Sequence, residues 1–301
     1  MNSASPHARP GRLAVGIIGA GRVGAALGAA LARAGHTVVA ASGVSRASRD
    51  RAARLLPGVP LLPADEVVAV ADLVLLAVPD DTLAGLVDGL AEIGAWRPGQ
   101  IVAHTSGAHG LAVLATAAEH GVLPLALHPA MTFTGRPEDV HRLTGVTFGT
   151  TAPEGLEPVA AALVVEMGGE PVPIAEELRP LYHAALVVGA NHLVTLVAES
   201  MDMLRQAGVD KPGQVLGPLL GAALDNSLRY GDGALTGPVS RGDAGTVRKH
   251  LATLTAHTPG GVAAYVAMAR RTADRAIGSG RLEPRDAVAL LDVLAAEEAR
   301  S

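Results

Sequence analysis

The chain has 301 residues, enough for about two domains. Hydrophobic residues make up 49% and charged residues 18%, which excludes a disordered or fibrous protein. Aromatic residues make up only 2% and the net charge is −5, so we expect no nucleic-acid surface. Because the chain has no cysteine, disulfides, thiolate nucleophiles and thiolate-bound metals are excluded.

The beginning of the chain does not resemble a targeting signal. Met1–Arg12 is polar, and the apolar run 13–18 is too short for a signal peptide. A later apolar stretch, 184–198, is interrupted by polar residues and is shorter than the ~20 residues of a membrane span. We therefore expect a cytoplasmic protein that does not enter a membrane.

Short apolar runs alternate with helical spacings in the first half of the chain. The runs predict strands at 13–18, 37–41, 73–78, 101–104 and 122–127, and helices between them at 23–34, 48–56, 82–93 and 111–120. Two more strands, 145–149 and 170–174, flank a helix at 156–167. This alternation predicts an α/β domain with a doubly wound parallel sheet.

No strand pattern follows Glu176. Helical stretches are expected at 177–206, 213–229, 243–256, 260–276 and 284–299, with glycine or proline at the breaks. We therefore predict an α/β domain over residues 12–176 and an all-α domain over residues 177–301.

A glycine-rich motif directly follows the first strand: Gly19-Ala20-Gly21-Arg22-Val23-Gly24. The first two glycines permit a tight turn and the approach of a pyrophosphate, and the third permits helix–sheet packing. The N–H groups at the start of the next helix suit the anion. This context favours dinucleotide binding, and a turn that merely needs glycine is the alternative.

The residues after the second strand bear on the choice of cofactor. An NAD site usually has a carboxylate there, whereas this chain has Ser42, Ser45 and Arg46. Hydroxyl and guanidinium groups suit a 2′-phosphate, which favours NADP(H), unless Arg46 is only a solvated loop residue.

Three further loops follow predicted strands, where ligands bind to open α/β sheets. Val78, Pro79 and Asp80 follow one strand, and an N-cap role for Asp80 or Asp81 is the simpler interpretation. The segment His104-Thr105-Ser106-Gly107 follows the next strand and faces the nicotinamide end, unless it is a polar turn. His128 follows another strand, where a catalytic and a structural role are equally plausible.

In the helical half, His183 and Asn191 are eight residues apart, within ~80° on one helix face and ~12 Å along the axis. They are either functional or satisfied by core partners. Arg241 lies in a glycine-flanked turn that suits a substrate carboxylate or phosphate, while Asp243 is explained as a helix N-cap. The scattered histidines have no zinc-ligand spacing, so no metal site is expected.

Together, these motifs resemble the Rossmann-like proteins with a C-terminal domain of unknown function, the domain-of-unknown-function-2520 family. The motifs are the glycine loop, Val-Pro-Asp-Asp, His-Thr-Ser-Gly, Leu-His-Pro, Leu-Tyr-His with the later Asn, and Leu-Thr-Gly-Pro with the later Arg-Gly-Asp. The family is similar to ketopantoate reductases, β-hydroxyacid dehydrogenases and pyrroline-5-carboxylate reductases. The resemblance implies an NADP-binding domain and a helical domain of the 6-phosphogluconate-dehydrogenase C-terminal type that often forms dimers.

One position departs from the related enzymes. In the ketopantoate and β-hydroxyacid enzymes, a lysine four residues before the helical asparagine donates the proton. If Asn191 matches that asparagine, the lysine position is Val187, which cannot act as an acid. His183, one turn earlier, is the expected replacement because its unperturbed pKa suits proton donation.

These observations predict an NADPH-dependent reductase of a small carbonyl acid, with ketopantoate as one candidate. His183 would supply the proton, Asn191 and Ser106 would hold the carbonyl, and Arg241 would hold the carboxylate. His128 is the competing proton donor. Imine reduction and an NADP-binding regulatory protein without chemistry are the alternatives. The apolar helical domain, including residues 216–224, predicts a homodimer.

Overall fold

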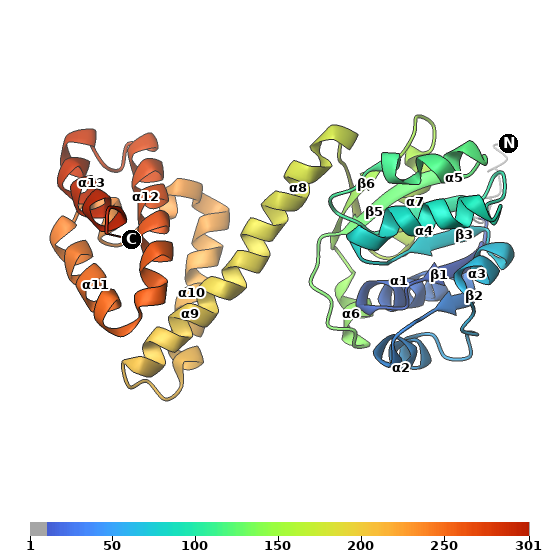
Figure 1. Ribbon diagram of the computed structural model, residues 1–301, viewed down its shortest axis with the longest axis horizontal. Coiled ribbons are helices and arrows are strands. Elements are labelled where there is room, and N and C mark those ends of the chain that lie inside the picture. The colour runs from blue at the N-terminus through green and yellow to red at the C-terminus, as the bar shows by residue number, and fades with distance from the viewer. Residues whose placement is uncertain (1–10, 301) are drawn as a thin grey trace, which may run out of the picture. The chain divides into compact units, whose positions relative to one another are not determined.

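Seven strands form one sheet in the order β2-β1-β3-β4-β5-β6-β7 in the computed structural model, which describes residues 11–300 (Figure 1). Residues 1–10, which include most of the polar N-terminal segment, and Ser301 lie outside the described residues. The strands lie where the apolar runs predicted them: β1 (Ala14–Ile18), β2 (Thr37–Ser42), β3 (Leu73–Leu76), β4 (Ile101–His104), β5 (Leu123–Pro129), β6 (Thr147–Thr151) and β7 (Glu170–Pro173).

The predicted doubly wound parallel sheet is confirmed, and the structure departs from parallel order only at the last two strands. Strands β1 to β5 are parallel, but β6 pairs antiparallel with β5, with His128 opposite Gly149, and β7 runs parallel to β6. The connection between β5 and β6 contains only one short helix, α6 (Glu138–Arg142). β6 therefore starts at the edge of the sheet where β5 ends, and the two strands run in opposite directions.

Helices cover both faces of the sheet, as in a doubly wound fold. One core joins the sheet to α1 (Arg22–Arg33), α2 (Arg46–Leu55), α6 and α7 (Glu157–Glu166). The other joins it to α3 (Ala64–Val70), α4 (Asp80–Glu92), η1 (Leu111–Leu114) and α5 (Ala115–Glu119). The short helices α3 and α6 were not predicted, because seven and five residues are too few for a helical period to emerge.

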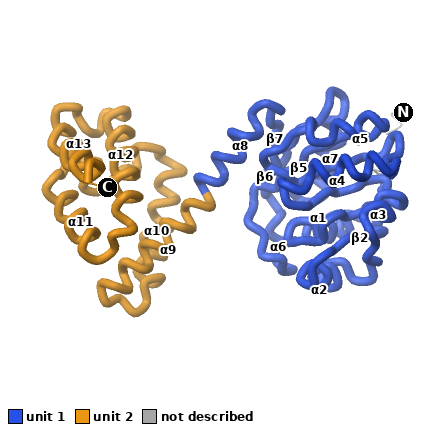
Figure 2. Tube along the Cα trace, in the orientation of Figure 1, with its two compact units in different colours: residues 1–189 blue, residues 190–301 orange. Residues whose placement is uncertain are grey.

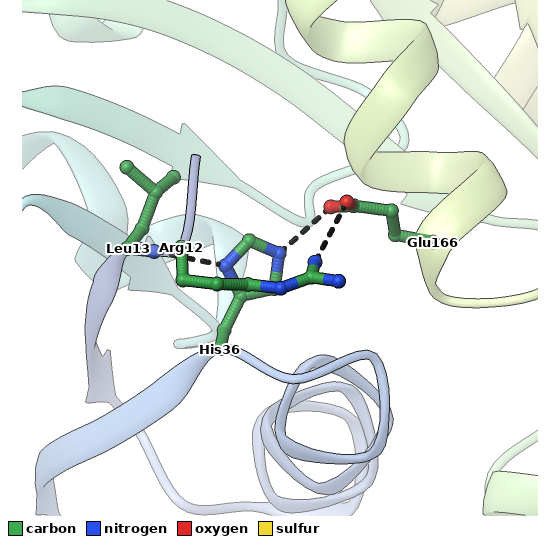
Figure 3. A network of polar contacts seen from close by, with 4 residues as sticks. All are labelled: Arg12, Leu13, His36 and Glu166. Carbon is green, nitrogen blue, oxygen red and sulfur yellow. Dashed lines mark hydrogen bonds and ion pairs between the residues drawn. The ribbon is translucent and has the colours of Figure 1, made fainter. Parts of the chain in front are cut away.

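A polar network ties α7 to the sheet edge at which β1 and β2 begin (Figure 3). The backbone N–H of Leu13 donates to Nδ1 of His36 at 3.2 Å, so Nε2 carries the hydrogen that faces Glu166 at 2.7 Å. Arg12 donates to the other oxygen of the same carboxylate. This network lies at the edge opposite to the strand ends where ligands bind such folds, so it has a structural role.

The second half is entirely helical among the described residues. It contains η2 (Glu176–Leu178), α8 (Arg179–Leu186), the π-helical segment η3 (Val187–Asn191), α9 (His192–Gln206), α10 (Pro212–Tyr230), η4 (Gly231–Ala234), η5 (Val239–Arg241), α11 (Ala244–His257), η6 (Pro259–Gly261), α12 (Val262–Gly278) and α13 (Pro284–Glu298). The chain divides into two units, 1–189 and 190–301 (Figure 2). This division falls within η3, later than the boundary expected near Glu176. The second unit has its own core between α11, α12 and α13.

One helical run in the described part of the chain, Glu176–Gln206, is long and apolar enough by length and composition to cross a membrane. It spans 31 residues with a mean hydropathy of 1.5 in its most apolar window, so it is longer than the apolar stretch 184–198 suggested. None of the residues in that window is buried, and the start of the run is polar and makes hydrogen bonds within the first unit, as described below.

Candidate functional site

The glycine loop between β1 and α1 contains glycines that the fold requires and one that it does not. Gly19 has φ +94°, and a Cβ there would lie 2.5 Å from the carbonyl oxygen of Ala77. A Cβ on Gly24 would overlap the carbonyl oxygen of Gly19, so this position also excludes a side chain. Gly21 has an ordinary φ of −72°, and a Cβ there would meet only the Gly19 oxygen, at 3.9 Å. Neither strain nor packing explains the glycine at position 21.

Gly21 is also the N-cap of α1 and makes no side-chain cap bond to the first backbone N–H groups. The helix begins with Arg22, which is exposed, and Val23, which is half-buried. Orphan N–H groups at a helix start attract an anion, and Gly21 leaves room for one to approach. The loop therefore fits the pyrophosphate of a dinucleotide.

The residues after β2 have structural contacts of their own. The Gly19 N–H donates to Oγ of Ser42 at 3.2 Å, and the Ala20 N–H donates to the carbonyl oxygen of Ser42 at 2.7 Å. Ser45 is the N-cap of α2, where its side chain accepts from the Ser48 N–H. These bonds hold the end of β2 against the glycine loop.

Arg46 is the first residue of α2, and its side chain is 91% exposed. Its nearest charged partner is Asp50, at 3.9 Å on the same helix. The guanidinium is therefore free to turn toward a ligand beside β2, while the neighbouring carboxylate partly offsets its charge.

The loop after β3 lies against the glycine loop, across the point where the strand order reverses. A Cβ on Gly19 would lie 3.1 Å from a methyl group of Val78, which places the two loops in contact. Pro79 is the N-cap of α4, and neither Asp80 nor Asp81 makes a cap bond, so the N-cap interpretation of these aspartates is wrong. Both carboxylates instead lie in the first turn of α4, where their negative charge interacts favourably with the helix dipole.

The loop after β4 is organised by His104, which is fully buried. The Ser106 N–H donates to Nδ1 of His104 at 3.2 Å, so Nε2 carries the hydrogen and donates to the Gly110 carbonyl oxygen at 2.8 Å. Burial lowers the pKa of His104 to about 4. Oγ of Ser106 accepts from the His109 N–H. The structure thus places His104 and Ser106 inside a closed polar turn.

The start of the long helical run docks on this loop through one polar face. Glu176 accepts from the N–H groups of Leu111 at 2.6 Å and Ala112 at 3.0 Å. Arg179, at 0% exposure, donates to the Ser106 carbonyl oxygen and to Oγ1 of Thr151, each at 2.8 Å. Glu176, Arg179 and the pair Tyr182 and His183 recur every three or four residues, which is the spacing of one helix face.

His128, Tyr182 and His183 meet where β4 and β5 end. The Tyr182 hydroxyl lies 2.9 Å from Nδ1 of His128, and the rings of His128 and His183 are edge-to-face, with centroids 6.0 Å apart. Gly107 provides the space, because a Cβ there would lie 2.7 Å from Cδ2 of His183 and 3.0 Å from Nε2 of His128. The structure therefore brings both candidate proton donors to one place.

Burial and charge keep His128 neutral at physiological pH. Burial, followed by the charges of Arg179 and His183, lowers the pKa of His128 to about 4, and Asp80 opposes this shift. Burial also raises the pKa of the Tyr182 hydroxyl and lowers the pKa of the Arg179 guanidinium. At neutral pH, His128 is thus a hydrogen-bonding group and not a cationic acid.

Of the three site residues predicted in the helical half, His183 lies in the first unit, and Asn191 and Arg241 lie in the second. Asn191 is exposed and is the last residue of the π-helical segment η3. This segment interrupts the regular α-helical spacing from which His183 and Asn191 were predicted to share one helix face. Arg241 is exposed at the end of η5, before Gly242, which has φ +70°. Asp243 caps α11 by accepting from the Thr246 N–H, as the N-cap interpretation expected. Among the described residues, no cluster of His, Asp or Glu could hold a metal ion.

The sequence analysis quoted Tyr182 and Gly107 only as members of motifs, and it gave no role to Glu176 or Arg179. Glu176, Arg179 and Tyr182 form an i, i+3, i+6 series at the start of an otherwise apolar helix, a signal that is present in the sequence. The steric need for glycine at position 107 could not be predicted, since it comes from side chains on β5 and α8.

The sheet order and the glycine loop define a Rossmann-type domain followed by a helical region. A Rossmann-like domain model matches residues 1–129, and the model of a domain of unknown function, DUF2520, matches residues 146–272. The chain therefore contains a Rossmann-like domain followed by a DUF2520 domain, as the motifs suggested. No curated protein matches the sequence.

Several solved structures share the fold along most of the chain. BF3122 from Bacteroides fragilis, provisionally described as an NADP oxidoreductase, is 22% identical, with a TM-score of 0.73 over 87% of this chain and 98% of that one. Protein TM1727 from Thermotoga maritima is 20% identical, with a TM-score of 0.64 over 88% and 99%. The V8 variant of an imine reductase from Myxococcus stipitatus, in complex with NAD+, is 17% identical, with a TM-score of 0.61 over 94% and 99%. At these identities the similarity establishes the fold.

Proposed function

We propose that the protein is an NADPH-dependent oxidoreductase that reduces a small carbonyl acid, such as a ketopantoate-like 2-keto acid or a substrate of related β-hydroxyacid chemistry. The observation that carries the cofactor assignment is Gly21, a glycine that the fold itself does not need. A close-lying ligand explains it, because a side chain would stand between the pyrophosphate and the start of α1.

The chain's residues fit a bound NADP(H) at three places. The segment Gly19–Gly24 would hold the pyrophosphate, Val78–Asp80 would lie beside it, and Ser42, Ser45 and Arg46 would bind the adenosine 2′-phosphate. The bound cofactor supplies the hydride. A fold shared with the imine reductase that was solved with NAD+ supports a nicotinamide dinucleotide, while the choice of NADP(H) depends on Arg46.

The remaining roles fall to the chain's own side chains. His183 supplies the proton to the reduced substrate, and it lies beside Gly107 and His128 at the ends of β4 and β5. We assign the substrate carbonyl to Asn191 and Ser106 and its carboxylate to Arg241, on the sequence argument alone. We also propose that the protein acts in the cytoplasm as a homodimer.

Reduction of an imine is the second candidate. It is favoured by the fold shared with an imine reductase and by Val187, which would occupy the position of the proton-donating lysine if Asn191 matches the asparagine of the related enzymes. A third possibility, an NADP-binding regulatory protein, predicts tight cofactor binding without turnover.

The cofactor assignment is tested by comparing Gly21→Ala with Gly24→Ala. We expect Gly21→Ala to fold with wild-type stability, since its φ suits alanine and its surroundings are open. Its dissociation constant for NADPH should rise at least tenfold. Gly24→Ala should unfold more easily by ~1–3 kcal/mol, because its Cβ meets the loop backbone. Unchanged NADPH affinity in Gly21→Ala contradicts the assignment.

The reaction is tested by NADPH oxidation with a panel of keto acids and cyclic imines, with NADH in parallel. Turnover of keto acids supports the first proposal, turnover of imines alone selects the second, and binding without turnover selects the third. His183→Ala should lower kcat by ~10²–10⁴ with nearly unchanged NADPH affinity. If only the matched variant His128→Ala loses activity, the proton donor is His128 of the Rossmann domain and not His183.

A further inference from the structure

The hydroxyl of Tyr182 meets His128 in a geometry that constrains where the imidazole hydrogen lies. A neutral imidazole has one nitrogen that donates and one that accepts. The Tyr182 hydroxyl lies 2.9 Å from Nδ1 of His128. A phenol is a stronger hydrogen-bond donor than acceptor, and Nδ1 can offer a lone pair, so the phenolic hydrogen lies between the two atoms. Nδ1 then accepts, and the imidazole hydrogen lies on Nε2.

Nε2 of His128 faces the space above Gly107. A Cβ on that glycine would lie 3.0 Å from Nε2 and 2.7 Å from Cδ2 of His183, so the two rings converge there. Within the described part of the chain, Nε2 has no hydrogen-bond partner, whereas both ring nitrogens of His104 are occupied. The Nε2–H group of His128 is a fixed donor without an acceptor from the protein.

The charges around His128 keep it in this neutral form. Arg179, buried on the same helix face as Tyr182, and His183 both disfavour a second positive charge, and only Asp80 favours one. A neutral N–H group in such a place stabilises negative charge that develops on a substrate oxygen, without giving up its hydrogen.

We propose that Tyr182 is a positioning residue that fixes His128 as its Nε2–H tautomer, and that this N–H donates to the substrate carbonyl oxygen. The catalytic half of this inference rests on the proposed reductase function. It also narrows the substrate class, because a carbonyl oxygen accepts a hydrogen bond throughout reduction, whereas the N–H of an iminium ion would face the N–H of His128. The site therefore favours ketones over imines.

The tautomer is measured directly by ¹⁵N NMR of histidine-labelled full-length protein at pH 7. We expect His128 to have a protonated Nε2 and an unprotonated Nδ1 in the wild type. In Tyr182→Phe the two tautomers should both be populated. A wild-type His128 protonated at Nδ1, or an unchanged tautomer in Tyr182→Phe, overturns the proposal. If Tyr182→Phe does not fold, the wild-type spectrum alone decides.

A matched control exists in the second unit. Tyr265 contacts Nδ1 of His250 at 2.9 Å, and its ring meets the histidine at 86°, close to the 87° of Tyr182 and His128. Tyr265→Phe should alter the His250 spectrum and leave that of His128 and the turnover unchanged.

The catalytic half has separate readouts. With an active keto acid, Tyr182→Phe should lower kcat about tenfold, the effect of one hydrogen bond, with an unchanged NADPH dissociation constant. His128→Gln retains an N–H donor and should keep more activity than the apolar variant His128→Leu. Equal activity of these two variants, or turnover of imines only, overturns the role of His128 as hydrogen-bond donor to the substrate. The NMR measurement of the tautomer does not depend on whether a substrate is found.

Discussion

At the scale of single residues, the glycine loop shows how far a sequence motif can be interpreted. The pattern predicted that Gly19 permits the turn, Gly21 the approach of a pyrophosphate and Gly24 the packing of the helix, but it contained no measure of the space at each position. The structure separates them: Gly19 and Gly24 lack room for a side chain, and Gly21 does not. The separation depends on Ala77 from another strand end, which no local pattern contains.

Arg46 is expected to determine the preference for NADPH over NADH. We predict that the wild type binds NADPH at least tenfold more tightly and that Arg46→Ala removes most of this difference, because a charge-assisted bond to phosphate is worth ~1.5–3 kcal/mol. Isothermal titration with both cofactors measures it. Asp50→Asn should strengthen NADPH binding, since Asp50 lies 3.9 Å from the guanidinium. Arg54→Ala, at the other end of α2, is the control, and equal affinities of the wild type for the two cofactors contradict the prediction.

The buried histidines should make the first unit sensitive to acid. The pKa values of His104 and His128 are both lowered to about 4, mainly by burial, from 6.5 in the unfolded chain. The unfolded state therefore binds more protons between these values, so stability is complete above pH 6.5 and falls as the pH drops toward 4. For His104 alone the loss is about 3 kcal/mol.

Chemical denaturation between pH 8 and pH 4 checks this sensitivity. His104→Gln should be less stable at pH 8 but lose less stability on acidification, and the exposed control His120→Gln should follow the wild type. A wild-type stability that does not change between pH 6.5 and 4 would be inconsistent with neutral, buried histidines.

At the scale of elements, the positions of strands and helices could largely be predicted from the sequence. The direction of β6 and the contacts between the start of the long helical run and the loop after β4 could not. Apolar runs identify β6 and β7, but the strands' own residues do not fix the antiparallel pairing of β6 with β5. The apolar pattern of 184–198 likewise does not indicate the polar contacts that the start of the same helical run makes. Glu176 and Arg179 act there through loops that are distant in sequence.

Glu176 is expected to stabilise the turn after β4. Glu176→Ala removes both acceptors of the Leu111 and Ala112 N–H groups, so the first unit should lose ~1–3 kcal/mol of stability. Hydrogen exchange at these two amides should accelerate. The adjacent Glu177→Ala is the control, because Glu177 is exposed and has no such bond. Unchanged protection of both amides in Glu176→Ala would show that the carboxylate does not hold the turn.

At the scale of the whole molecule, α9 and α10 lack a core of their own. No residue of α9 is buried, and in α10 only Pro212 is. Large apolar side chains remain uncovered, including Val194 at 69%, Leu219 at 63% and Leu228 at 80% exposure. Monomeric proteins rarely leave many large apolar side chains in contact with water, and the proposed homodimer would cover them.

We predict that the protein is a dimer at tens of micromolar, measured by light scattering. The double variant Leu219→Glu and Leu228→Glu should have the mass of a monomer, since burying charges at an apolar interface is costly. Arg285→Glu, an exposed change at the start of α13, should leave the mass of the dimer unchanged. A monomeric wild type would refute the prediction.

The order of the strands also sets a length requirement. Arg46 follows β2 and His128 lies on β5, and four strand spacings separate these two strands, about 19 Å in all. A single ligand can therefore contact both Arg46 and His128 only if it is long enough to cross β1, β3 and β4. Reduced nicotinamide mononucleotide, which lacks the adenosine half, could occupy the end near His128 but would gain nothing from Arg46, so its binding should be indifferent to Arg46→Ala.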